Sequence, residues 1–293
     1  MAASHDLIAS YFTLAGQVLP HEPPLVSPVP LTARIDAAAH AGFAGMGFNF
    51  DDVAANRDRH GDAALRRMFA DAGMCWIELE ALIDWFADGE RRAVSDAQRR
   101  IALDQARAIG AFQIKIAGDM AGDWPLDLMA EAFSALCDEA AQDGIRVTIE
   151  LLPISNLPSI ARGLAVVGAA GHPNGGLMFD AWHVRRGHIA LADIAALPPG
   201  ICTGVELDDG PADPVVDDLY TEMIDCRRLP GDGDFDLVGL VAATRAAGYH
   251  GPYGVEILSP AQRAMTPLDA ARRAFDSSSA ILAEADRAPE RIS

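Results

Sequence analysis

Short apolar runs alternate with longer amphipathic stretches along the whole chain. Short apolar runs of this kind are typical of buried strands. We expect strands at residues 7–14, 45–50, 75–79, 113–117, 146–151, 176–180, 202–207 and 253–257. Apolar positions at helical spacing predict helices at residues 31–41, 62–72, 95–109, 126–143, 157–169, 190–196, 237–247 and 266–284.

Glycine marks the end of several expected helices in the same way. Gly42, Gly73, Gly144 and Gly248 each follow a helical stretch, where a left-handed cap favours glycine. Strands that alternate with helices predict βαβ units and a parallel sheet. Eight such units fit a closed (β/α)₈ TIM barrel better than an open doubly wound sheet, and no Gly/Ser/Pro-rich linker divides residues 1–293, so we expect one domain.

Nucleotide-binding signatures are absent from the sequence. No GxGxxG follows the first expected strand, and no GxxxxGK[ST] occurs. The longest irregular stretch is 210–233, after the seventh expected strand. Because loops after barrel strands build the active-site face, we interpret it as a lid or binding loop, with a surface excursion as the plainer alternative.

Composition and charge narrow the classes of function. Half of the 293 residues are hydrophobic, which excludes a disordered chain. With 23 basic and 42 acidic residues, the net charge of −19 argues against nucleic acid as a partner. No apolar stretch of about 18 residues predicts a membrane span. We see no signal peptide, and four scattered cysteines predict free thiols, so we expect a cytoplasmic protein.

Acidic residues recur at the ends of the last four expected strands. Glu150, Asp180, Glu206 and Glu256 each lie there, and Asp208 shares the inward parity of Glu206. A carboxylate in an apolar strand costs several kcal/mol unless something compensates it. One divalent cation held by all four explains the set better than four independent structural acids.

A resemblance to a known family is carried by four segments: 147–153, 179–184, 205–211, and 227–236 running on to Glu256. In these segments the chain resembles the xylose-isomerase-like barrel enzymes, also called sugar phosphate isomerases/epimerases. The Asp-x-x-His pair at 180–183 and the Arg-x-Leu-Pro-Gly-x-Gly stretch from Arg227 are the most specific motifs. The resemblance implies a TIM barrel with Glu150, Asp180 and Glu256 as metal ligands. It also implies that His183 and Arg227 contact the substrate.

Strand seven departs from this family pattern. Many relatives have His or Gln at the position of Glu206, which leaves open whether Glu206 binds the metal, with Asp208 as the reserve ligand. Ligation by oxygen alone favours Mn²⁺ over Zn²⁺, with Mg²⁺ or Co²⁺ also possible. Four carboxylates around a +2 ion predict a strongly acidic site or extra bound protons.

Lys115 is the only lysine in the chain. We expect it to project from the fourth strand into the barrel mouth, where nearby acids keep it protonated as a general acid or oxyanion clamp. The alternative is a counter-charge for the surplus carboxylates. Glu80 is expected to line the pocket floor or to hydrogen-bond a sugar hydroxyl, with a solvated strand-end acid as the alternative.

These features predict a metal-dependent sugar isomerase or epimerase that acts on a keto-sugar or polyol-derived α-hydroxy ketone through an enediolate. Glu150 and Glu256 would transfer the proton. The alternative is a dehydratase or lyase that uses the same enolate, with Lys115 or His183 as acid. A non-catalytic sugar-binding protein and an abasic-site endonuclease come from other classes, and the charge opposes the latter. A homo-oligomer is also possible.

Overall fold

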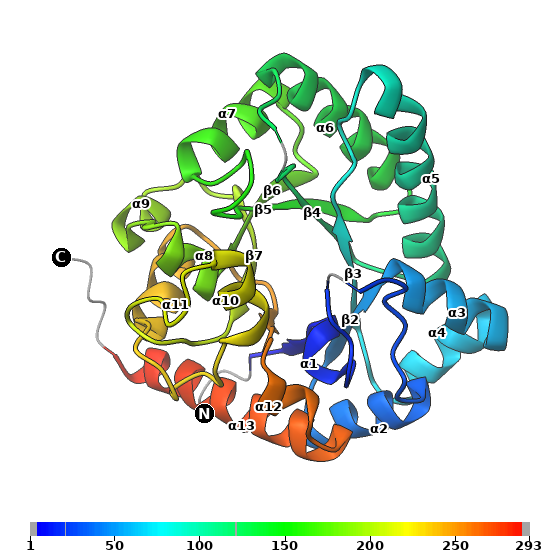
Figure 1. Cartoon of the computed structure of the whole chain (residues 1–293), viewed down its shortest axis with the longest axis vertical. Helices are drawn as coiled ribbons and strands as arrows, with labels where there is room; N and C mark the ends of the chain where they lie inside the picture. Colours follow the sequence, from blue (N-terminus) through cyan, green and yellow to red (C-terminus); the bar gives the residue numbers. More distant parts are fainter. Residues whose placement is uncertain (1–4, 21, 121, 289–293) are drawn as a thin grey trace.

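The computed structural model describes residues 5–20, 22–120 and 122–288. Within them, eight parallel strands follow sequence order around a closed barrel, and helices surround them (Figure 1). The strands are β1 (Leu7–Ala9), β2 (Gly45–Asn49), β3 (Trp76–Leu82), β4 (Gln113–Ala117), β5 (Arg146–Glu150), β6 (Gly175–Asp180), β7 (Cys202–Leu207) and β8 (Tyr253–Val255). The single eight-stranded β/α barrel expected from the sequence is confirmed.

The helices form the outer layer, and the last helix, α13, packs beside α2 to close the ring (Figure 1). The longer ones are α2 (Leu31–Ala41), α3 (Phe50–His60), α4 (Asp62–Asp71), α5 (Arg92–Ile109), α6 (Leu126–Ala141), α7 (Ile160–Ala170), α11 (Leu237–Ala246) and α13 (Pro267–Arg287). The shorter ones are α1 (Tyr11–Leu14), α8 (Ala181–Arg186), α9 (Leu191–Ala195), α10 (Leu219–Asp225), α12 (Pro260–Arg263) and the 3₁₀ turn η1 (Gly89–Arg91). The four glycines expected as left-handed caps, Gly42, Gly73, Gly144 and Gly248, all have positive φ.

The first expected strand, 7–14, is wrong beyond Ala9. The chain turns at Ser10 and forms α1 instead. Contacts with distant strands favour this turn, because the Tyr11 amide donates to the Glu80 carboxylate and Thr13 Oγ1 donates to the Val255 carbonyl at 2.7 Å. A local apolar pattern carries no information about such partners.

Helix α3 was not expected from the sequence. It begins at the Asn49 cap, whose side chain accepts from the Asp51 amide, and it buries only Asp52, Val53 and Asn56. Two of those three positions are polar, so the apolar stripe that identifies a surface helix is missing. The buried Asp52 is instead paired with Arg34 of α2 at 2.7 Å.

The stretch 210–233 contains α10, which two buried arginines hold in place. Arg186 of α8 donates to both carboxylate oxygens of Glu222, at 2.9 and 2.6 Å. Arg263 of α12 pairs with Asp225 and donates to the Ile224 carbonyl at 3.0 Å. These contacts hold α10 in place beside the barrel mouth, and the interpretation of the stretch as a lid or binding loop stays a prediction.

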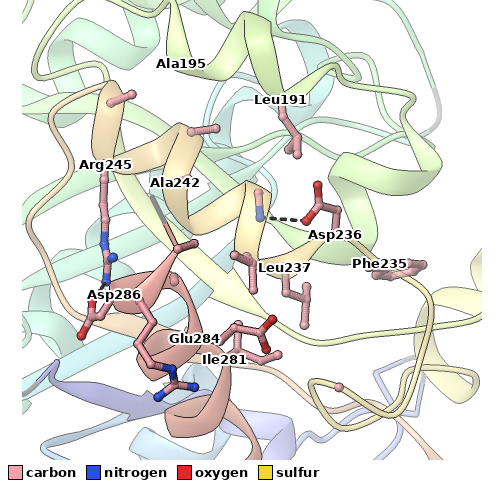
Figure 2. Close-up of a pocket in the computed structure, with 18 of the residues that line it drawn as sticks. Leu191, Ala195, Phe235, Asp236, Leu237, Ala242, Arg245, Ile281, Glu284 and Asp286 are labelled. Atoms are coloured by element: carbon pink, nitrogen blue, oxygen red, sulfur yellow. Dashed lines mark hydrogen bonds and ion pairs between the residues drawn. The ribbon is translucent and has the colours of Figure 1, made fainter. Parts of the chain in front are cut away.

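A cavity of about 1100 Å³ lies in the helical layer, between α9, α11 and α13 (Figure 2). Its lining includes Leu191, Phe235, Leu237, Arg245 and Ile281. None of the strand-end acids 150, 180, 206 and 256 lines it. The chemistry expected from the sequence therefore belongs to the barrel mouth and not to this cavity.

Two other expectations concern the cysteines and membrane-spanning helices. All four cysteines are free thiols, as expected. Among the helices in the described ranges, none combines the length and the apolar character that crossing a bilayer requires.

Candidate functional site

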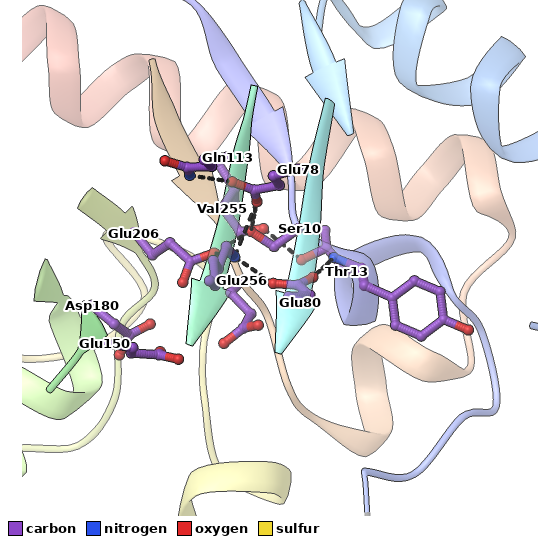
Figure 3. A network of polar contacts seen from close by, with 12 residues as sticks. Ser10, Thr13, Glu78, Glu80, Gln113, Glu150, Asp180, Glu206, Val255 and Glu256 are labelled. Carbon is purple, nitrogen blue, oxygen red and sulfur yellow. Dashed lines mark hydrogen bonds and ion pairs between the residues drawn. The ribbon is translucent and has the colours of Figure 1, made fainter. Parts of the chain in front are cut away.

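Strand register brings the four expected metal ligands together at the carboxyl end of the barrel. Glu150 ends β5, Asp180 ends β6 opposite Glu206 of β7, and Glu256 directly follows β8. Each residue offers one oxygen, and these oxygens all lie within 4.8 Å of one another. Figure 3 shows the side chains converging from neighbouring strands. This spacing is compatible with one cation held between them.

Polar atoms in this cluster also lack partners. Among the described residues, Glu206 Oε2 and Asp208 Oδ1 are buried without a hydrogen bond. A buried polar atom without a partner costs free energy, and a bound cation would remove that cost for Glu206. The residues present therefore fit a divalent metal.

His183 lies beside the first two acids of the cluster. Asp180 caps α8 by accepting from the His183 amide at 2.9 Å, which brings the imidazole back over the strand ends. Nε2 of His183 lies 3.0 Å from Glu150 Oε1 and 3.8 Å from Asp180 Oδ1, and Nδ1 is buried without a partner in the described chain. Glu150, Asp180 and His183 thus form a second possible ligand set. The sequence predicts His183 as a substrate contact, and that role stays a prediction.

Burial alone would raise the pKa of Glu150. The neighbouring His183, together with Lys115 and Arg227, instead lowers it to about 2. Glu256 differs, because burial and the charge of Glu206 raise its pKa well above the usual range despite Arg227. The two carboxyl groups expected to transfer a proton therefore have unequal environments.

Arg227 reaches the cluster from the end of the 210–233 segment. Its Nη1 lies 2.7 Å from Asp180, 2.5 Å from Asp208 and 3.0 Å from Glu256, and its guanidinium lies 5.8 Å from the centre of the Trp182 ring. Burial lowers the pKa of Arg227, but these carboxylates outweigh it and raise the pKa well above its usual value. The guanidinium is thus a permanent positive charge among the proposed ligands.

Lys115 points from β4 into a second group of acids. Its Nζ lies 3.0 Å from Glu78 and forms close ion pairs with Glu80 and Glu206. The side chain is 1 % exposed. Burial lowers its pKa, yet the surrounding acids raise it well above the usual range. The lysine is therefore protonated and within reach of the carboxylates, as its sequence context suggests.

Glu80 lies deeper than a sugar-binding residue at the mouth would. It is 4 % exposed and accepts from Lys115 and from the Tyr11 amide. The alternative of a solvated strand-end acid is wrong, since β3 continues to Leu82 and buries it. Sequence reasoning gave no role to Ser10 because Ser10 lay within an expected strand. Its hydroxyl donates to Glu206, and Oγ also lies 3.4 Å from Glu78.

Charge in this region is strongly unbalanced. Seven buried acids (Glu78, Glu80, Glu150, Asp180, Glu206, Asp208 and Glu256) share two basic side chains, Lys115 and Arg227. Burial raises the pKa of Glu206 and Asp208 well above the usual range, and neighbouring acids add to the effect. The site therefore attracts cations or retains protons, as the sequence predicts.

A family model described as "Xylose isomerase-like TIM barrel" matches residues 35–280. The chain belongs to this family. The family assignment agrees with the resemblance carried by the Asp-x-x-His and Arg-x-Leu-Pro-Gly-x-Gly motifs.

Among curated proteins, the chain is similar to two 3-dehydroshikimate dehydratases. That of Pseudomonas aeruginosa is 27% identical over 245 residues, and that of Pseudomonas putida is 25% identical over 242. The matches cover 80% of this chain and 37% of each relative. The chain thus spans little more than a third of the length of these relatives.

Solved structures share the fold at lower identity. The IOLI protein with a bound zinc atom has a TM-score of 0.81 at 15% identity, over 95% of this chain and 98% of that one. An L-ribulose 3-epimerase has a TM-score of 0.71 at 18% identity, over 97% of this chain and 96% of that one. These likenesses establish the barrel architecture.

Proposed function

We propose that the chain is a divalent-metal-dependent enzyme that enolises a small hydroxy ketone at the carboxyl end of the barrel. The observation that carries the proposal is the convergence of Glu150, Asp180, Glu206 and Glu256, with one oxygen of each within 4.8 Å of the others. Oxygen ligands suit Mn²⁺ best among the ions considered, with Mg²⁺ or Co²⁺ as substitutes. A bound divalent cation supplies Lewis acidity, which polarises a ketone and acidifies the adjacent C–H.

The side chains of this chain divide the remaining work. Glu256 has a raised pKa and exchanges the substrate proton, and Glu150 is the second proton carrier expected from the sequence. His183 stands beside Glu150 and orients substrate oxygens. Arg227, held among Asp180, Asp208 and Glu256, presents positive charge to the oxygen that becomes negative during enolisation.

For the overall reaction, we propose dehydration of a β-hydroxy ketone. The Glu150 carboxylate takes the proton from the carbon next to the carbonyl and later releases it to solvent, the resulting enolate re-forms the ketone, and the C–O bond at the β-carbon breaks. The leaving hydroxide takes a proton from Glu256 or His183 and departs as water. The similarity to two dehydratases over 80% of the chain supports this outcome.

Isomerisation or epimerisation of a keto-sugar is the second candidate. It shares the enolate, and it requires two carboxyl groups near one carbon, which Glu150 and Glu256 provide within the same cluster. The product then depends on which face or which carbon receives the proton. An L-ribulose 3-epimerase shares the fold.

We propose an unphosphorylated substrate. Arg227 is paired with three carboxylates, and Arg91, in the segment after β3, is paired with Asp84 and Asp119. A phosphate group would enter a region in which acids outnumber bases and would be repelled.

The proposal is tested with metal-stripped protein reloaded with Mn²⁺, Mg²⁺, Co²⁺ or Zn²⁺ in turn. Each form is incubated with 3-dehydroshikimate, an inosose and a panel of ketoses. Water loss from 3-dehydroshikimate gives an aromatic dihydroxybenzoate, which is followed by its ultraviolet absorbance, and the sugar products are separated by chromatography. We expect turnover that requires metal and is fastest with Mn²⁺. Protein that binds no divalent ion, or turns over equally without one, contradicts the proposal.

A further inference from the structure

Lys115 has as many acidic neighbours as it has hydrogens to donate. An ammonium carries three N–H groups, and Nζ of Lys115 contacts three carboxylates, those of Glu78, Glu80 and Glu206. The side chain is 1 % exposed. Two of its N–H groups donate to Glu80 and Glu206, and Glu78 lies 3.0 Å from Nζ, so carboxylates surround the buried ammonium.

Glu206 belongs both to this lysine cluster and to the proposed metal cluster. Its Oε1 accepts from Lys115 and from Ser10. Its Oε2 is buried with no hydrogen-bond partner among the described residues. The two oxygens therefore have different surroundings: Oε1 accepts from an ammonium and a hydroxyl, and Oε2 is free for a ligand.

We infer that Lys115 is a positioning residue that holds one oxygen of Glu206, offsets part of its negative charge and leaves the other oxygen as the metal ligand. The inference rests on the metal site of the proposed function. The ammonium, which also contacts Glu78 and Glu80, offsets part of the negative charge that Glu206 presents to the cation. Lys115 acts on the metal site through Glu206 and does not touch the substrate.

The residue type agrees with this role. Lysine is a compact point charge with donors in three directions, whereas the guanidinium of arginine is a planar fork. Three acids that converge on one nitrogen suit the ammonium. Arginine supplies every other basic side chain of the protein, and only this position has lysine.

The sign of the electrostatic effect makes the inference testable. Glu206→Gln keeps an amide oxygen for the cation but leaves the Lys115 ammonium less neutralised beside it. Metal affinity should then fall. Adding Lys115→Met removes the repelling charge, so the double variant should bind metal more tightly than Glu206→Gln alone.

The experiment titrates Mn²⁺ calorimetrically into the metal-stripped wild type, Lys115→Met, Glu206→Gln and the double variant. We expect Glu206→Gln to weaken Mn²⁺ binding about 100-fold and the double variant to return to within about 10-fold of wild type. Lys115→Met alone should bind Mn²⁺ at least as tightly as wild type. Thr148→Val is the control, since Thr148 pairs with Lys115 in register but hydrogen-bonds Thr203 at 2.7 Å, and its affinity should not change.

Failure of the inference and failure of the proposed function are distinguishable. A wild type that binds no Mn²⁺ overturns the proposed function and the inference together. A wild type that binds Mn²⁺, with a double variant no tighter than Glu206→Gln, overturns the inference alone. Should the double variant not fold, the same comparison is made with Glu80→Gln added to each variant. This substitution removes one of the buried carboxylates that lose their ammonium partner in Lys115→Met.

Discussion

Gly254 of β8 lies directly opposite Glu206 of β7, and a Cβ built on it would fall 2.6 Å from Glu206 Cγ and 2.9 Å from Oε1. Real Cβ atoms do not approach other atoms that closely, so any residue larger than glycine at position 254 would displace the Glu206 carboxylate. The position of this proposed ligand on β7 therefore depends on Gly254 of β8 as well as on β7 itself.

Gly254→Ala should push Glu206 away from Lys115 and the other acids. We expect weaker Mn²⁺ binding and a loss of about 1–3 kcal/mol in the free energy of unfolding, as for other overpacked cores. Calorimetric titration and denaturant unfolding measure both. Gly168→Ala in α7 is the matched control, because its Cβ would meet nothing within 4 Å, and a helical Gly→Ala change usually stabilises. Unchanged metal affinity in Gly254→Ala would contradict the placement of Glu206.

Removal of metal should lower both activity and stability. A ligand that binds only the folded state stabilises it by about 2.7 kcal/mol at 100 times its Kd. We therefore expect EDTA to lower the melting temperature of the wild type and to abolish turnover, with Mn²⁺ restoring both. Asp180→Asn should melt at the same temperature with and without Mn²⁺. A wild-type melting temperature that does not respond to Mn²⁺ would rule out the metal site.

Arg227→Ala separates substrate binding from metal binding. The guanidinium contacts Asp180 and Glu256, and removing a positive charge beside a cation site does not weaken the attraction for the cation. We expect metal content close to wild type, measured by elemental analysis, with a fall in kcat or a rise in KM on whichever substrate the panel identifies. Loss of metal in Arg227→Ala would instead show that the arginine supports the ligands.

Arg186 and Glu222 should control the order of the 210–225 region. Arg186→Met leaves Glu222 buried without a counter-charge, which costs about 3–5 kcal/mol. We expect faster cleavage of this region in limited proteolysis and a lower melting temperature. Arg92→Met breaks an exposed pair with Asp96, and it should change stability by less than about 1 kcal/mol. Equal effects of the two substitutions would contradict a clamping role.

The cysteines should react in the order of their exposure. Burial raises the pKa of Cys137 and Cys202 to about 12, so almost no thiolate is present at neutral pH. Cys75 is exposed and should be alkylated first by iodoacetamide, with Cys226, which is partly buried, reacting more slowly. Peptide mass analysis after timed labelling measures the order. Early labelling of Cys137 or Cys202 in the folded protein would contradict the packing described.

The sequence alone was sufficient to predict the barrel and to name the acids that meet in it. Short apolar runs and glycine-capped helices alternate along the chain, and eight such units fit a closed barrel. The positions of Glu150, Asp180 and Glu206 at the ends of their strands then predict that they meet at one end of the barrel, because parallel strands all point the same way. Lys115 was a candidate site residue because it is the only lysine in the chain. The polar helix α3 and the turn at Ser10 lacked such a local pattern.

Only the tertiary structure decided which charges are paired. Register between β7 and β8 places Gly254 against Glu206, and the Lys115 ammonium lies among Glu78, Glu80 and Glu206, two of which are on β3. Arg227 comes from a loop and meets Asp180 and Glu256 across the barrel mouth. Such pairings depend on distances of a few ångströms between residues far apart in the chain. Periodicity gives the face on which a side chain lies, whereas electrostatic interaction and coordination depend on the separation between atoms, which only the folded chain fixes.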